Sequence, residues 1–317
     1  MPAPATLVFT LATAEAAALK ETLAADGWVF SDAPYAYWRA TRGKTNVVAY
    51  HSGKTTFQGA DAEAAASRLL PGRAPLPSAK PQLLRGDGTK ATDLEIALRD
   101  DPQMFQPHAG IDESGKGDYF GPLVVACAFT DAESAAKLID AGIRDSKLLA
   151  SDKEAVKLDA VIKGVLKGRF SLITVSPERL NQLHAQIGNL NQLLAWGHAK
   201  ALEELLAKVP ECPRAISDQF GKGNLVRRRL QERGRRIVLD EHPKAEADIA
   251  VAAASILARA AYISEMKRLG TAAGLLLPKG CSDRVVVTAR EFLKLHPFAE
   301  LNKYAKTFFK TTQKLED

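Results

Sequence analysis

The feature that most constrains the fold is a stretch near the middle of the chain where two acidic residues precede a glycine-rich turn. Asp112 and Glu113 follow a short apolar segment and are followed by Ser-Gly-Lys-Gly at 114–117. An apolar, partly β-branched run then fills residues 123–130. Such a run is typical of a buried strand, and we predict that it forms a hairpin with the strand that carries the acids.

The two adjacent acids cannot both face one site from a straight strand, because successive side chains point to opposite faces. Both reach a single metal centre only where the strand ends or bends, and Ser114-Gly115 is expected to supply that break. Lys116 lies between two glycines, which let backbone approach a ligand closely. Oxygen ligands for a hard cation beside a lysine suit phosphodiester chemistry. The alternative interpretation is a strand and turn whose charges are merely solvated.

The complete string at 110–122, Gly-Ile-Asp-Glu-Ser-Gly-Lys-Gly-Asp-Tyr-Phe-Gly-Pro, resembles the signature of the type 3 ribonucleases H (ribonuclease HIII). The resemblance extends through Asp-Ser-Lys-Leu at 145–148, Asp-Gln-Phe at 218–220 and Ala-Ala-Ala-Ser-Ile-Leu-Ala-Arg at 252–259. With the N-terminal segment it covers nearly the whole chain. It implies an α/β, ribonuclease-H-like catalytic domain at 108–317, with a mixed sheet flanked by helices.

Residues 1–70 are expected to form a small α+β domain in the order strand, helix, four strands, helix. The strands are predicted at 5–9, 28–30, 35–40, 46–51 and 55–57, and the helices at 12–25 and 61–70. This order favours an antiparallel sheet with helices on one side. It resembles the TATA-box-binding-protein-like domain that binds the hybrid substrate in type 3 ribonucleases H. Proline and glycine interrupt residues 71–107, which we interpret as a linker with one short helix at 92–99.

Aromatic residues alternate with polar ones in the predicted N-terminal strands. They are Trp28, Phe30, Tyr35, Tyr37, Trp38 and Tyr50. For any one of them, packing in the core is the favoured interpretation, since aromatic side chains dominate cores. A solvent-facing row on one side of the sheet would instead indicate contact with nucleic acid.

The remainder of the catalytic domain mixes helices and strands. Helices are predicted at 134–141, 151–166 and 247–267, and from an N-cap at Ser176 through residue 205. Strands are predicted at 170–175, 215–217 and 236–239. The C-terminal region is expected to be mostly helical, with four lysines near one helical face: Lys303, Lys306, Lys310 and Lys314.

Further acids complete the candidate metal site. Asp218 ends an apolar strand, and strand ends in open α/β sheets are where ligands gather. The resemblance implies that Asp112, Glu113 and Asp218 are catalytic metal ligands. It implies a fourth acid before the Ala-rich helix, for which Glu246 is favoured and Asp248 is the alternative. Carboxylates around one pocket repel one another, and a pair of Mg²⁺ or Mn²⁺ ions would resolve that conflict.

The resemblance implies hydrolysis of the RNA strand of an RNA–DNA hybrid, leaving 5′-phosphate and 3′-hydroxyl ends. The group that distinguishes the strands is the 2′-hydroxyl, which the Gly115-Lys116-Gly117 backbone is expected to contact. Ser146 and Lys147 resemble a second phosphate or sugar contact. The scattered histidines are predicted to be structural: His184, His198, His242 and His296. The alternatives are a type 2-like enzyme that cuts at single embedded ribonucleotides and a non-catalytic hybrid-binding module.

Composition adds weaker constraints. The net charge of +6 is compatible with a polyanionic partner. The three cysteines show no zinc or disulfide spacing, which suits the cytoplasm. No lysine or arginine precedes Lys20 and no uncharged apolar run approaches about 18 residues, so we expect neither a secretory signal nor a membrane-spanning helix. Nothing indicates an oligomer, and we expect a monomer.

Overall fold

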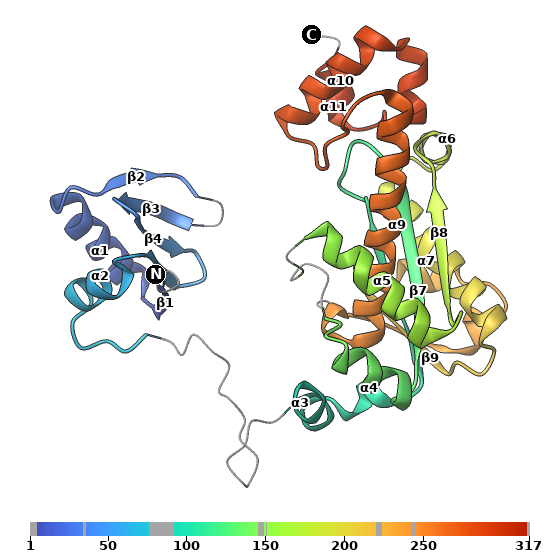
Figure 1. Cartoon of the computed structure of the whole chain (residues 1–317), viewed down its shortest axis with the longest axis horizontal. Helices are drawn as coiled ribbons and strands as arrows, with labels where there is room; N and C mark the ends of the chain where they lie inside the picture. Colours follow the sequence, from blue (N-terminus) through green and yellow to red (C-terminus); the bar gives the residue numbers. More distant parts are fainter. Residues whose placement is uncertain are drawn as a thin grey trace. The chain divides into compact units, whose positions relative to one another are not determined.

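The computed structural model describes residues 5–33, 36–75, 92–144, 149, 151–219, 224–242 and 245–315. The chain divides into two compact units, Met1–Ala91 and Thr92–Asp317 (Figure 1).

The boundary between the units lies inside the segment interpreted as a linker. Helix α3 (Asp93–Asp100) and the 3₁₀ turn η1 (Pro102–Phe105) belong to the second unit. The reason is packing, because Phe105 is 7% exposed and lies in the core of that unit. Residues 92–107 are therefore part of the second unit and not of the linker.

The first unit is a five-stranded antiparallel sheet in the order β1-β5-β4-β3-β2. Its strands are β1 (Ala5–Thr10), β2 (Val29–Ser31), β3 (Ala36–Arg42), β4 (Thr45–Tyr50) and β5 (Lys54–Gly59). Its helices are α1 (Thr13–Ala25) and α2 (Ala62–Leu69). Apolar residues of both helices share one core with alternate residues of the strands. The order of elements predicted from the sequence is confirmed.

The N-terminal aromatics mostly pack inside this unit. Trp28 and Trp38 are buried in the core, and Phe30 is half-buried against it. Tyr50 is half-buried, whereas Tyr37 is exposed and its ring meets that of His51 edge-on. Tyr35 lies outside the described residues. Over the described strands there is thus no row of exposed aromatics, and core packing is the prevailing role.

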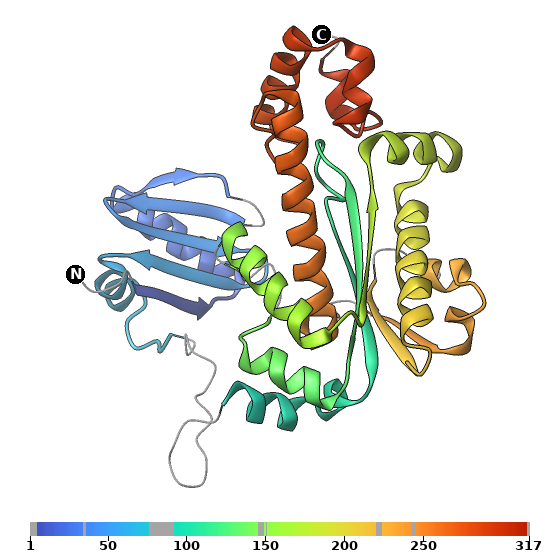
Figure 2. The same cartoon turned by 45° about the vertical axis from the view of Figure 1, so that its right-hand side comes forward.

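The second unit is built on a mixed five-stranded sheet in the order β10-β9-β6-β7-β8 (Figures 1 and 2). Its strands are β6 (His108–Ser114), β7 (Leu123–Thr130), β8 (Phe170–Val175), β9 (Arg214–Asp218) and β10 (Val238–His242). The β6–β7 and β7–β8 pairs are antiparallel, and β9 is parallel to both β6 and β10. The predicted hairpin of β6 and β7 is confirmed.

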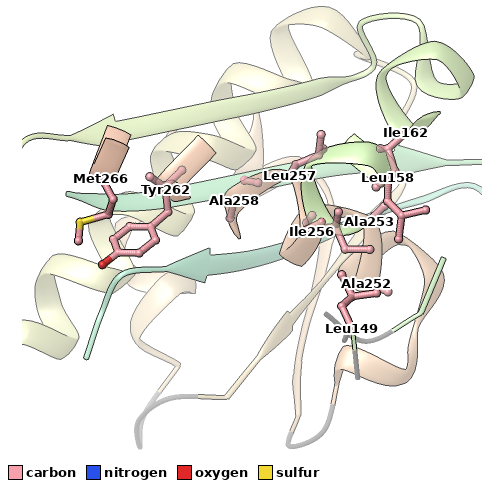
Figure 3. Packing of buried hydrophobic residues seen from close by; sticks show 14 of the residues in the cluster. Leu149, Leu158, Ile162, Ala252, Ala253, Ile256, Leu257, Ala258, Tyr262 and Met266 are labelled. Carbon is pink, nitrogen blue, oxygen red and sulfur yellow. The ribbon is translucent and has the colours of Figure 1, made fainter. Parts of the chain in front are cut away.

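Helices cover the sheet on both faces. The helices of this unit after α3 are α4 (Ala132–Asp140), α5 (Asp152–Leu166), α6 (Pro177–Ile187), α7 (Leu190–Lys208), α8 (Leu225–Arg229), α9 (Ile249–Ala273), α10 (Asp283–Leu295) and α11 (Lys310–Gln313). The core on one face centres on α9 (Figure 3), and the core on the other face centres on α7. Every residue of β7 is buried, as expected for a strand covered on both sides.

Helix α9 is long and apolar enough to span a membrane by length and composition. It is instead the central helix of the unit, because 72% of its most apolar window is buried and it packs along β6 and β7. Close approach depends on Gly110, where a Cβ would lie 2.1 Å from the backbone nitrogen of Val251. Strand β6 and helix α9 therefore meet backbone to backbone at this point.

The prediction of one C-terminal helical face of lysines is wrong. The region consists of α10, the 3₁₀ turn η5 (Phe298–Lys303) and the short α11, with irregular backbone between them. Lys306 lies in that irregular part and is fully buried. The chain cannot continue as a helix there because residues 304–306 hydrogen-bond to the loop between β6 and β7.

Candidate active site

Two candidate acids lie at matching ends of neighbouring parallel strands. Strands β6 and β9 pair from Ala109 with Ala215 to Ile111 with Ser217. Asp112 and Asp218 are the next residue on each strand. Parallel strands end at the same edge of a sheet, so the fold brings these two acids, more than a hundred residues apart in sequence, to one place.

The side chains of Asp112 and Glu113 point to opposite faces of the sheet. Asp112 accepts a hydrogen bond from the hydroxyl of Ser255 on α9. Glu113 Oε2 lies 2.8 Å from Nε2 of His198 on α7. Strand β6 remains paired with β7 through Ser114, so the break at Gly115 comes too late to turn both acids to one face.

The surroundings of these two carboxylates shift their pKa values in opposite directions. Burial, followed by the negative charge of Glu113, raises the pKa of Asp112 to about 6. Burial also opposes ionisation of Glu113, but its hydrogen bond to His198 and the charges of His198 and Lys116 lower its pKa overall. Lys116 Nζ lies 3.5 Å from Glu113 Oε1. Glu113 is thus held as an anion, whereas burial and the neighbouring anion oppose the ionisation of Asp112.

His198 is a residue of this site that the sequence did not reveal. It is fully buried on α7, and its second ring nitrogen, Nδ1, lies 3.0 Å from Ser217 Oγ. The imidazole therefore links Glu113 on β6 to Ser217, the neighbour of Asp218 on β9. Only the tertiary fold brings α7 under these strands, and no local pattern around residue 198 marks it.

The candidate acids do not form a closed cage in this conformation. Within the part of the chain that the structure describes, no three His, Cys, Asp or Glu side chains are close enough to hold a metal ion. The donor chemistry nevertheless suits a hard cation, because Asp112 is a buried carboxylate whose ionisation is opposed by burial and by its acidic neighbour. A divalent cation at this edge would relieve that repulsion.

The two glycines of the turn differ in how closely neighbouring atoms approach them. Gly115 has φ +88°, and a Cβ there would lie 2.2 Å from the carbonyl oxygen of Pro122, so the fold itself requires glycine. A Cβ at Gly117 would meet nothing within 4 Å. Lys116, between them, is partly exposed. Gly117 is thus exposed and has free space on its Cα side, while its carbonyl oxygen accepts a hydrogen bond from Cys281 Sγ at 2.9 Å.

The two alternatives for a fourth acid differ in their surroundings. Asp248 is the N-cap of α9 and accepts hydrogen bonds from the backbone of Ala250 and Val251. It also lies 2.9 Å from Nε2 of the buried His108. Glu246 lies half-buried in the 3₁₀ turn η4 (Ala245–Ala247) just before the helix. Asp248 therefore caps α9 and pairs with His108.

The remaining predicted substrate contacts, Ser146 and Lys147, lie outside the described residues.

The raised pKa of Asp112 predicts a specific pH dependence of stability in EDTA. A carboxyl with a folded-state pKa near 6 and an ordinary value of 3.8 binds its proton more tightly in the folded state. Its ionisation therefore destabilises the fold as pH rises. Asp112→Asn should be isostable with the parent near about pH 4 and more stable by up to ~3 kcal/mol near about pH 7. Urea unfolding across this range measures the difference, and a flat difference would contradict the assigned burial.

Comparison with known proteins identifies the family. The family model described as Ribonuclease HII matches residues 109–312, and a domain of unknown function (DUF3378) matches residues 6–81. The ribonuclease HIII of Protochlamydia amoebophila is 33% identical over 96% of this chain and 94% of its own. That of Chlamydia pneumoniae is 34% identical over 98% of this chain and 97% of its own.

A solved structure is similar to this chain over nearly its whole length. The crystal structure of Bst-RNase HIII in complex with Mn²⁺ is similar to this chain with a TM-score of 0.64 and 28% sequence identity, and covers 98% of both chains. The matches to family model, sequences and structure are consistent with one another and include both units. The chain belongs to the ribonuclease HIII family and is a ribonuclease H-type hydrolase.

Proposed function

We propose that this protein cuts the RNA strand of RNA–DNA hybrids with the help of divalent cations and leaves 5′-phosphate and 3′-hydroxyl ends. The single observation that carries the proposal is the placement of Asp112 and Asp218 at the same edge of the sheet, with Glu113 next to them. Membership of the ribonuclease HIII family supports the same reaction.

We assign the role of metal ligands to Asp112, Glu113 and Asp218, with Glu246 as a fourth acid. Mn²⁺, present in the Bst-RNase HIII crystals, or Mg²⁺ would supply Lewis acidity for activating water and for stabilising charge on the leaving oxygen. Ser255 on α9 holds the Asp112 carboxylate through a hydrogen bond. Glu113 contacts His198 at 2.8 Å on the opposite face of the sheet, so it must turn toward Asp112 to share a metal ion.

Substrate recognition is assigned to the turn that follows β6. The exposed Gly117 can approach the 2′-hydroxyl of the RNA strand, and the partly exposed Lys116 can meet a phosphate. We add Ser146 and Lys147 from the family resemblance. The three cysteines are free thiols, which supports a reducing compartment such as the cytoplasm.

Cleavage of two substrates, side by side, tests the proposal. One is a uniform RNA–DNA hybrid and the other is a DNA duplex with a single embedded ribonucleotide, each incubated with Mg²⁺, Mn²⁺ or EDTA. We expect efficient cutting of the uniform hybrid with either metal and none in EDTA. Preferential cutting at the single ribonucleotide would indicate type 2 specificity, and binding without cleavage under every condition would indicate a hybrid-binding module.

Deleting residues 1–91, the first compact unit, should impair binding more than chemistry. The second unit has its own two cores and the candidate acids, so it should fold and turn over bound substrate. We expect KM for the hybrid to rise at least about tenfold, with kcat within about threefold of the parent. Steady-state kinetics measures both, and a fall confined to kcat would contradict a substrate-binding role for this unit.

A further inference from the structure

The loop between β6 and β7 is held by a segment from near the end of the chain. We call residues 302–307 the strap. The backbone N–H of Gly121 donates to the carbonyl oxygen of Tyr304 at 2.9 Å, and that of Lys306 donates to Tyr119 at 2.8 Å. Phe120 and Ala305 form an isolated β-bridge between these contacts. The strap thus fixes the second half of the loop whose first half is Gly115-Lys116-Gly117.

The side chain of Lys306 adds a second set of contacts to the same loop. It is fully buried, and its Nζ donates hydrogen bonds to the carbonyl oxygens of Asp118 and Gly121, both at 2.7 Å. Burying an amino group is costly unless it is hydrogen-bonded. One amino group that donates to two carbonyl oxygens fixes their separation, and Asp118 is the residue directly after Gly117.

The strap itself is anchored on its other side by one residue of α6. Asn181 Nδ2 donates to the carbonyl oxygen of Ala305 at 2.9 Å and to that of Asn302 at 3.2 Å. Its Oδ1 accepts from the backbone N–H of Thr307 at 3.0 Å. Asn181 thus uses both ends of its amide on the strap, and within the described residues it hydrogen-bonds to the strap and not to the loop.

We propose that Lys306 is a positioning residue: held in the strap that Asn181 anchors, its buried amino group sets the backbone at Gly115–Gly117 for recognition of the ribose-bearing strand. The inference rests on the proposed function and extends it, because it places a determinant of RNA selectivity nearly 200 residues from the loop. Within the described residues, neither Lys306 nor Asn181 hydrogen-bonds to Asp112, Glu113 or Asp218. Their effect should fall on substrate selection rather than on the metal site.

Equilibrium binding in EDTA tests this inference under conditions in which the substrate is not cleaved. The affinities of the full-length protein for an RNA–DNA hybrid and for duplex DNA of the same sequence give a selectivity ratio. Lys306→Met, which keeps an unbranched apolar side chain, should lower that ratio about tenfold, and Asn181→Ala about threefold. Lys310→Met is the matched control, because it removes the same charge from an exposed position four residues away. Its ratio should stay within about twofold of the parent.

The ratio separates positioning from simple loss of stability. A variant that is only less well folded weakens both affinities alike and leaves the ratio unchanged, and this result for Lys306→Met would overturn the inference. If Lys306→Met yields no folded protein, Asn181→Ala provides the test, since the Asn181 side chain is only half-buried. An unchanged selectivity ratio for Asn181→Ala would also overturn the inference. A parent protein that does not prefer the hybrid over duplex DNA would contradict the proposed function itself, and the inference with it.

Discussion

Asp112→Asn should abolish cleavage of an RNA–DNA hybrid, lowering kcat at least ~1,000-fold, while leaving hybrid affinity and folding intact. The substitution removes one anionic metal ligand but keeps the shape of the side chain. Its amide oxygen can still accept the hydrogen bonds from Ser255 and from the backbone N–H of Glu113. Since burial opposes the charge on Asp112, losing that charge should not lower the melting temperature.

The kinetic test compares this variant with Asp240→Asn. Asp240 is a half-buried aspartate on β10 of the same sheet and has no assigned role, so the same chemical change there should leave kcat within about twofold. Single-turnover cleavage separates the chemical step from binding. Near-normal turnover by Asp112→Asn would remove Asp112 from the metal site.

Gly110→Ala should strongly destabilise the second unit. The added Cβ would lie 2.1 Å from the backbone nitrogen and 2.6 Å from the Cα of Val251 in α9. Neither atom belongs to a flexible side chain, so the helix must move away from β6 along a heavily packed interface. Overpacking of this kind costs about 3 kcal/mol or more, a large share of the stability of a typical domain.

Gly164→Ala is the matched control for this substitution. Gly164 lies inside α5, where a Cβ would meet nothing within 4 Å. Alanine there should stabilise the helix by about 0.5–1 kcal/mol. Urea unfolding and the yield of soluble protein measure both variants. A Gly110→Ala protein as stable as the parent would show that α9 and β6 are not in backbone contact.

Local patterns in the sequence predicted most of the elements that position the site. The apolar run at 123–130 and the acids before it predicted the β6–β7 hairpin, because a strand buried on both faces has a continuous apolar pattern. The apolar strand that ends at Asp218 predicted its position at the sheet edge. Each of these signals is contained within about ten residues, which is the range over which strand patterns act.

What the sequence could not predict depends on contacts between distant segments. His198 lies within a stretch that the sequence predicts as helix, and only the packing of α7 under β6 places it against Glu113. The pattern of lysines predicts Lys306 near one helical face, whereas the loop after β6 buries it. The opposite orientations of Asp112 and Glu113 follow from the extent of β6–β7 pairing, which continues beyond both residues.

The central claim is that Asp112, Glu113 and Asp218 together hold divalent cations at this edge of the sheet. Crystals soaked in Mn²⁺, with anomalous diffraction recorded near the manganese absorption edge, test it most directly. We predict an anomalous peak within bonding distance, about 2.0–2.4 Å, of oxygens from these carboxylates, with Glu113 turned toward Asp112. Full Mn²⁺-dependent activity in crystals that show no manganese at these three residues would contradict the account.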